Sequence, residues 1–137
     1  MRRRSIRITE SDMRKLQRLL ESGKQYLRRD LAHLLSLEDE LRRAEEVSPY
    51  EIPPDVVTMN SRVRVRDLHR NEETTYTLVF PGDADISKNR VSVLAPLGTA
   101  LLGYKAGDVI QLEVPSGVRW LKVEEVLYQP EAAGVPA

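Results

Sequence analysis

Few side chains of this 137-residue chain are spaced for catalysis or metal binding. There is no cysteine, which excludes disulfides, thiolate nucleophiles and cysteine-ligated zinc. The two histidines, His33 and His69, are far apart and lack the His-x-x-x-His spacing of a helical zinc site, so we interpret both as partly exposed structural residues. No glycine-rich phosphate-binding motif is present, and Ser61, Ser92 and Ser116 have no base near them in the sequence. We therefore expect no catalytic centre, no metal and no cofactor.

Carboxylates do gather in one place, toward the end of a leucine-rich segment. They are Glu38, Asp39, Glu40, Glu45 and Glu46. Their spacing is typical of a solvated helix face, where Glu38 and Arg42 form an i,i+4 pair worth about 0.2–0.5 kcal/mol. The cluster therefore needs no catalytic explanation.

Composition describes a globular protein with a heavily charged surface. Apolar residues make up 41% of the chain and charged residues 31%, with a formal net charge of zero. Residues 1–47 carry 12 Lys+Arg against 9 Asp+Glu, an excess too small for a general nucleic-acid binder. Arg2, Arg3, Arg4 and Arg7 leave a weak DNA or phosphate contact open, with a solvated tail as the plainer interpretation. No apolar run approaches the ~20 residues of a membrane span, and we expect a cytoplasmic protein.

Two amphipathic helices are predicted in the first third of the chain. Thr9 followed by Asp12 fits a helix-start signal, and the apolar spacing predicts a helix over 10–21 that ends at Ser22-Gly23. A second helix over 25–46 has a near-heptad stripe, made of Leu27, Leu31, Leu34, Leu37, Leu41 and Ala44. Because short helices are marginal alone in water, we predict an antiparallel hairpin, a short coiled coil. A plain amphipathic helix lying on the domain is the alternative.

Three prolines then interrupt the helical pattern. Pro49, Pro53 and Pro54 predict a stiff extended linker, which divides the chain into a helical hairpin over 1–48, a linker over 49–55 and a second domain over 56–137. After the linker the apolar period becomes two, with predicted strands at 63–65, 74–80 and 91–94 and a hairpin of 109–114 with 118–128. The predicted fold class is α+β.

The segment 91–108, VSVLAPLGTALLGYKAGD, is the most informative part of that domain. Pro96 lacks an amide hydrogen and ends the strand that precedes it. A short apolar helical turn follows, and Gly103 is a natural C-cap. We expect this segment to pack on the sheet and to present one edge to solvent.

With VRVRDLHRNEETTYTLV, DADI and VPSGVRWLKVEEVLY, this segment resembles the C-terminal domain of the bacterial Gre transcript-cleavage factors. The resemblance implies an FKBP-like β-sheet domain with one short helix. SPYEIPPDVVTMNSRV and YQPEAAG extend it to the Rnk proteins of that superfamily, which are named regulators of nucleoside diphosphate kinase. Together these segments cover nearly all of the chain.

The resemblance implies a protein that binds bacterial RNA polymerase at the rim of its secondary channel, near the β′ coiled coil, and that competes with Gre-type factors. The segment matching the family's docking site comprises Ala95, Pro96, Leu97, Ala100, Leu101, Leu102 and Gly103. Gre factors usually have Ser-Pro where this chain has Ala95-Pro96, so one hydroxyl contact is absent.

The hairpin tip departs from the family pattern. In Gre factors, acidic tip residues coordinate the catalytic Mg²⁺. Here the tip consists of Glu21, Lys24, Arg28, Arg29 and Asp30, a basic set, and the hairpin is shorter. Magnesium prefers clustered carboxylates, so we transfer no catalytic residue and expect a regulator that does not cleave RNA.

Two other functions remain as alternatives. An FKBP-like fold could act as a peptidyl-prolyl isomerase, although fold does not imply function and aromatic residues are few. The name of the resembling family also suggests a protein that binds nucleoside diphosphate kinase directly. We expect a monomer, with pairing of two copies through the leucine stripe left open.

Overall fold

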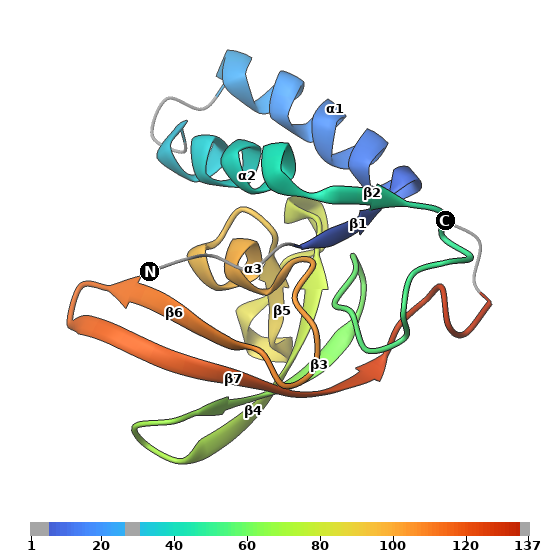
Figure 1. Ribbon diagram of the computed structural model, residues 1–137. Helices are drawn as coiled ribbons and strands as arrows, with labels where there is room; N and C mark the ends of the chain where they lie inside the picture. The colour runs from blue at the N-terminus through green and yellow to red at the C-terminus, as the bar shows by residue number, and fades with distance from the viewer. Residues whose placement is uncertain (1–5, 27–30, 135–137) are drawn as a thin grey trace.

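The computed structural model describes residues 6–26 and 31–134. Two helices lie side by side above a curled five-stranded sheet, and a short third helix, α3, lies between this helical pair and the sheet (Figure 1). The α+β class predicted from the sequence is confirmed, with an N-terminal helical pair and a C-terminal β domain. Among the described residues, no helix is both long enough and apolar enough to cross a membrane.

Helix α1, Glu10–Tyr26, begins where the sequence predicts. The N–H of Asp12 donates to Oγ1 of Thr9 at 3.1 Å, which caps the first turn. The helix does not end at Ser22-Gly23 but continues to Tyr26. A single glycine costs only about 1 kcal/mol in a helix interior, which does not stop a helix already anchored by buried leucines.

Helix α2, Leu31–Arg43, ends three residues before the predicted boundary, and Gln25 and Tyr26, predicted as its first residues, belong to α1. The chain then forms strand β2, Glu45–Val47, which pairs in parallel with strand β1, Arg7–Thr9. The alternation of buried Ile6 and Ile8 with exposed Arg7 is the period-two signal of this strand. The sequence predicted only a tail or a short extended segment here, because a strand this short depends on its partner.

The main sheet has the strand order β5-β4-β3-β7-β6. Its strands are β3 (Arg62–Asp67), β4 (Glu72–Val79), β5 (Arg90–Ser92), β6 (Val109–Val114) and β7 (Gly117–Tyr128). Neighbours are antiparallel except β4 and β5, which are joined through the 3₁₀ turns η2 (Pro81–Asp83) and η3 (Ile86–Lys88). The predicted hairpin of 109–114 with 118–128 is confirmed.

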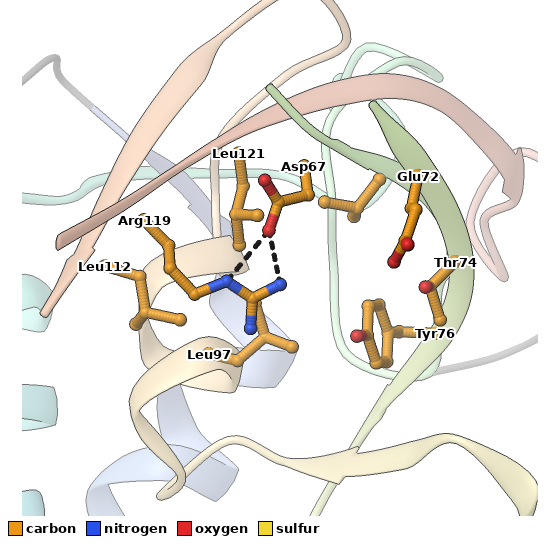
Figure 2. A pocket seen from close by; sticks show the side chains of 9 residues that line it. Asp67, Glu72, Thr74, Tyr76, Leu97, Leu112, Arg119 and Leu121 are labelled. Atoms are coloured by element: carbon orange, nitrogen blue, oxygen red, sulfur yellow. Dashed lines mark hydrogen bonds and ion pairs between the residues drawn. The ribbon is translucent and has the colours of Figure 1, made fainter. Parts of the chain in front are cut away.

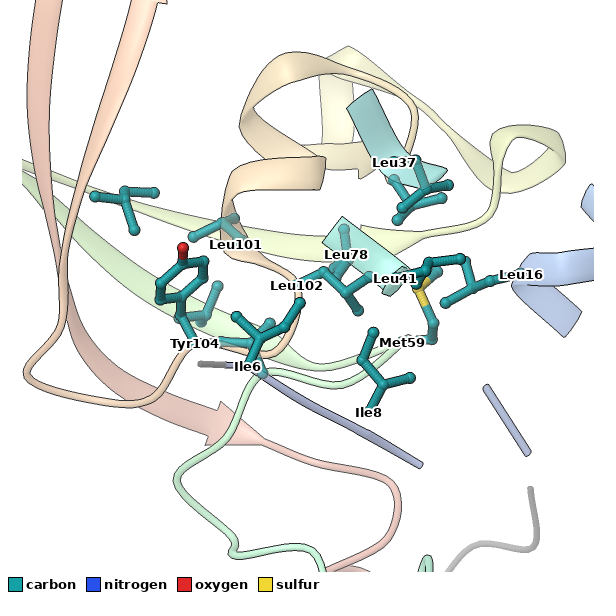
Figure 3. Close-up of a cluster of buried hydrophobic side chains, with 14 of the residues drawn as sticks. Ile6, Ile8, Leu16, Leu37, Leu41, Met59, Leu78, Leu101, Leu102 and Tyr104 are labelled. Atoms are coloured by element: carbon teal, nitrogen blue, oxygen red, sulfur yellow. The ribbon is translucent and has the colours of Figure 1, made fainter. Parts of the chain in front are cut away.

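One continuous apolar core joins the helices to the sheet. It contains Ile6, Ile8, Leu16, Leu37, Leu41, Met59, Leu78, Leu101, Leu102 and Tyr104, among others (Figure 3). Residues 49–55 form turns rather than an extended rod, and Ile52 within them is buried. The division at 49–55 stays a prediction, since the segments on either side contribute to the same core.

Candidate protein-docking site

The site is built on helix α3, Pro96–Leu101. Proline suits the first helical position, because its ring fixes φ near the helical value and its missing N–H would have no helical partner there. Oγ1 of Thr99 donates to the carbonyl of Val93 at 2.6 Å, which ties the helix to the preceding strand. A Cβ on Gly98 would lie 2.0 Å from the carbonyl oxygen of Ser92, so the helix is pressed against its neighbouring backbone. The first turn of α3 is therefore held in one position.

The predicted docking residues divide into a surface group and a core group. Pro96 is exposed, and Ala95, Leu97 and Ala100 are half-buried. Leu101 and Leu102 are only 0% and 1% exposed and lie in the apolar core (Figure 3). Their side chains cannot contact a partner in this fold. The part of the segment that can meet a partner is its first turn.

Gly103 is also buried, and it supports the helical pair. Its φ is +81°, a left-handed conformation that favours glycine, and a Cβ there would lie 2.6 Å from Cβ of Ile6. The N–H of Arg7 points to the Gly103 carbonyl at 3.4 Å, and the Gly103 N–H donates to the carbonyl of Val57 at 2.9 Å. At Gly103, therefore, the C-terminal part of the chain lies in close contact with Ile6 and Arg7 at the start of β1.

A second anchor of the helical pair is Asp12, which is 5% exposed. Its Oδ2 accepts the backbone N–H of Met59 at 3.0 Å. Burial is the main cause that raises the pKa of this carboxyl to about 6; the Met59 hydrogen bond opposes the rise, and the charge of Glu131 adds to it. From the sequence Asp12 is only a helix-start residue, and no local signal connects it to Met59.

The last described residues hold the segment around Met59 in place. Oγ1 of Thr58 donates to Oε1 of Glu131 at 2.7 Å. Nε2 of Gln129 donates to the carbonyls of Pro53 and Val56, both at 2.8 Å. The YQPEAAG segment thus braces the loop that receives Asp12.

The hairpin tip lies largely outside the described residues. Glu21 is exposed on α1, Lys24 lies in the last turns of α1, and Arg28, Arg29 and Asp30 fall outside the described ranges. Within residues 6–26 and 31–134, no group of three or more His, Asp or Glu side chains is arranged to hold a metal ion.

The arginines of β3 do not form a basic face. Arg64 pairs with Glu73 at 2.8 Å and Glu125 at 3.0 Å, and Arg66 pairs with Glu73 at 3.1 Å and Glu124 at 2.8 Å. The charges of Arg64 and Arg66 are thus matched by carboxylates of β4 and β7. Paired arginines of this kind are a weak basis for binding a phosphate backbone.

A small pocket lies beside α3, with Leu97 in its wall (Figure 2). Its volume is about 40 Å³, and Asp67, Glu72, Thr74, Tyr76 and Arg119 supply its polar lining. Nε and Nη2 of Arg119 donate to Oδ2 of Asp67 at 2.9 and 2.5 Å. Small-molecule sites usually enclose about 300–1,000 Å³, so this pocket is too small for a prolyl peptide. It gives no support to the isomerase alternative.

Asp67 has a structural role in that pocket. Its Oδ1 accepts the backbone N–H groups of His69 and Arg70 at 2.9 and 3.0 Å, which closes the turn between β3 and β4. The hydrogen bond from the Arg70 N–H has the largest effect on the pKa of Asp67 and that from the Arg119 side chain the next largest, and together with the other contacts they lower this pKa to about 2. The carboxylate is occupied by its own turn and is not available as a base.

Comparison with known proteins identifies the family. The protein-family model described as "Transcription elongation factor, GreA/GreB, C-term" matches residues 52–128, and the family model described as "Rnk N-terminus" matches residues 4–47. A "Regulator of nucleoside diphosphate kinase" of Escherichia coli K12 is 46% identical over 135 residues, which span 98% of this chain and 97% of the relative. A "Transcription elongation factor GreA" of Clostridium botulinum is 40% identical over 93 residues, 68% of this chain and 58% of the relative.

A solved structure agrees with both matches. The "Prokaryotic transcription elongation factor GreA/GreB from Nitrosomonas europaea" superimposes with a TM-score of 0.74 at 46% identity, over 90% of this chain and 99% of that one. The GreA/GreB match covers α3 and the whole five-stranded sheet, and the Rnk match covers the helical pair. The chain belongs to the GreA/GreB family of transcription elongation factors, as a member with an Rnk N-terminus.

Proposed function

We propose that this protein is a transcription regulator that binds bacterial RNA polymerase at the rim of the secondary channel and competes there with Gre-type factors, in the cytoplasm. The observation that carries the proposal is the GreA/GreB match over residues 52–128, which includes α3 and its exposed first turn. Relatives matched in this region bear the name of transcription elongation factors.

The docking surface in this proposal is the first turn of α3. Pro96 and the half-buried Ala95 and Leu97 present a small apolar edge, and Gly98 and Thr99 hold it rigid. A rigid apolar edge suits a protein partner because little side-chain freedom is lost on binding.

We further propose that the protein does not cleave RNA. The tip residues Glu21 and Asp30 are outnumbered by Lys24, Arg28 and Arg29, so the tip repels Mg²⁺ rather than collecting it. Helix α1 has 17 residues and is about 25 Å long, which limits how far the hairpin reaches. The protein would occupy the site of a Gre factor without supplying its chemistry.

The test is binding of the full chain to core RNA polymerase, with a Gre factor as competitor. Wild type should bind and be displaced by the Gre factor. In the matched pair of variants, Pro96→Glu should weaken binding at least about tenfold, whereas Val118→Glu, an exposed apolar position on β7, should not. Binding that a saturating Gre factor leaves unchanged would exclude a shared site.

Direct regulation of nucleoside diphosphate kinase is the second candidate, favoured by the printed name of the relative from Escherichia coli. Titration of the purified kinase with this protein would decide it. A saturable change in kinase activity in the absence of polymerase supports the second candidate, and no change supports an indirect route through transcription.

A further inference from the structure

In the part of the chain whose side chains are described, the leucine stripe of α2 is not available for a second copy of the chain. Leu34, Leu37 and Leu41 are buried against the protein's own core. Any self-association must therefore use another surface. Among the described residues, the main sheet leaves the outer side of its edge strand β6 without a partner strand.

The two edges of that sheet differ. Strand β5 has three residues, and its start is covered by the chain itself, because Asp85 and Arg90 exchange backbone hydrogen bonds of 3.0 and 2.9 Å. Strand β6 has six residues and forms the other edge, beside β7 and with no described strand on its outer side. Long, open edge strands are templates for pairing with another strand.

Backbone direction shows which residues of β6 face outward. The N–H of Gly107 donates to the Val123 carbonyl at 2.7 Å, and the N–H of Val123 donates to the Asp108 carbonyl at 2.9 Å. Bonded pairs recur every second residue in an antiparallel ladder, and Ile110 is opposite Leu121. The amides and carbonyls of Ile110, Leu112 and Val114 therefore point to β7. Those of Val109, Gln111 and Glu113 point away from the sheet.

We propose that two copies of this chain associate by pairing their β6 edges antiparallel, with the two-fold axis passing between the two Gln111 residues. In this register Val109 lies opposite Glu113 of the second copy, so all outward-facing amides meet carbonyls. Ile110 lies opposite Leu112 of the second copy, which keeps apolar core-facing residues together. The solvent-facing residues likewise stay on one face.

Charge complementarity supports this register, and Pro115 disfavours the register shifted toward the strand end. Val109 is flanked by Lys122 on β7, so Glu113 of the second copy lies two strands from Lys122 on the same face. Strands are about 4.8 Å apart, which brings these side chains within reach of one another, and symmetry repeats the pair. Moving the register by two residues toward the strand end places Val109 opposite Pro115, which has no N–H to donate.

The contact involves one short strand from each copy, so the dimer is expected to be weak and concentration-dependent. The proposal does not depend on polymerase binding. It replaces the monomer expected from the sequence with a monomer–dimer equilibrium.

Absence of cysteine makes the register directly testable. Directly opposed residues of a bonded antiparallel pair have Cα atoms about 5.5 Å apart, within the range for a disulfide. Gln111→Cys should therefore cross-link to dimer under mild oxidation at least tenfold faster than Glu113→Cys. Glu113→Cys and Val109→Cys should each stay monomeric alone and cross-link when mixed.

The unmodified chain provides a second readout. Its mass by sedimentation equilibrium should rise from 15.6 kDa toward twice that value between about 10 µM and 1 mM. Gln111→Pro removes an outward-facing N–H, so it should keep the fold and abolish the rise. A wild-type mass that stays at 15.6 kDa throughout, or Glu113→Cys cross-linking as fast as Gln111→Cys, would overturn the proposal.

Discussion

Oδ2 of Asp12, in the first turn of α1, accepts the backbone N–H of Met59 at 3.0 Å, and so a residue of the helical pair is hydrogen-bonded to the C-terminal part of the chain. With the Ile6–Gly103 contact, this bond fixes the base of the helical pair against the segment that leads out of α3. A partner that binds α3 would therefore meet the hairpin in a defined direction.

The Asp12 carboxyl should make stability depend on pH. Its pKa is raised to about 6 from an ordinary 3.8. The stabilising contribution of the protonated carboxyl to the free energy of unfolding is therefore fully present below pH 3.8 and is lost as pH rises through 6. Asp12→Asn keeps an acceptor for Met59 without the buried charge. The free energy of unfolding of this variant should gain about 3 kcal/mol relative to wild type between pH 3 and pH 7.

Urea unfolding at a series of pH values measures that difference. Asp12→Ala is the matched control, because it removes the charge and also leaves the Met59 N–H without its partner, at a cost of about 1–3 kcal/mol. If the difference in free energy of unfolding between wild type and Asp12→Asn does not change with pH, the pKa of Asp12 is not raised in the folded protein.

Gly103→Ala should be strongly destabilising. The new Cβ would lie 2.6 Å from Cβ of Ile6, at a φ of +81°. We expect a loss of about 2–4 kcal/mol, from the strain of a left-handed residue and the displacement of Ile6. Gly82→Ala is the control, with nothing within 4 Å of its Cβ, and should stay within about 0.5 kcal/mol of wild type. Thermal or urea unfolding of the two variants compares them, and equal stabilities would contradict the contact.

Leu101 and Leu102 illustrate what the sequence could predict and what it could not. The apolar spacing located both helices of the hairpin, and the period of two located the strands. The sequence predicts that Pro96 ends a strand and that a helical turn follows it, whereas α3 begins at Pro96 itself. An apolar helical turn has a core side and a surface side, and the sequence did not separate them. The docking prediction therefore included Leu101 and Leu102, which are core residues, beside the exposed Pro96.

The contacts that join the helical pair to the rest of the chain also could not be predicted from local sequence patterns. The contact of Asp12 with Met59, the clash that requires glycine at position 103 and the pairing of β1 with β2 all join residues distant in the sequence. None of them changes the local spacing of apolar residues. The predicted end of α1 was wrong for a different reason. The free-energy cost of Gly23 in the helix is small compared with the stabilisation from packing of the helix.

Leu101→Ala should confirm the core assignment. Truncation of a buried leucine costs about 2–5 kcal/mol, so this variant should unfold at clearly lower urea. Pro96→Glu should leave stability within about 0.5 kcal/mol of wild type, because the side chain is exposed and a negative charge suits a helix N-terminus. If Leu101→Ala is as stable as wild type, the side chain is not packed as described.

Asp67 and Arg119 should contribute unequally to the pocket. Asp67→Ala removes the acceptor of two turn amides and of Arg119, whereas Arg119→Ala removes only the partner of one oxygen. The melting temperature of Asp67→Ala should therefore fall more. Because the pKa of Asp67 is lowered to about 2, its contribution is present above pH 3.8 and is lost as pH falls through 2. Equal melting temperatures of the two variants at pH 7 would contradict the role of the turn.

The most direct test of polymerase docking places a photo-reactive residue at position 96 and, as the control, at position 118, and illuminates each variant with core RNA polymerase. Position 96 lies in the exposed first turn of α3, and position 118 lies on β7. We expect position 96 to cross-link to the β′ subunit, position 118 to cross-link weakly or not at all, and a Gre factor to suppress the cross-link. No cross-link from position 96 under conditions where the folded protein binds polymerase would contradict docking through α3.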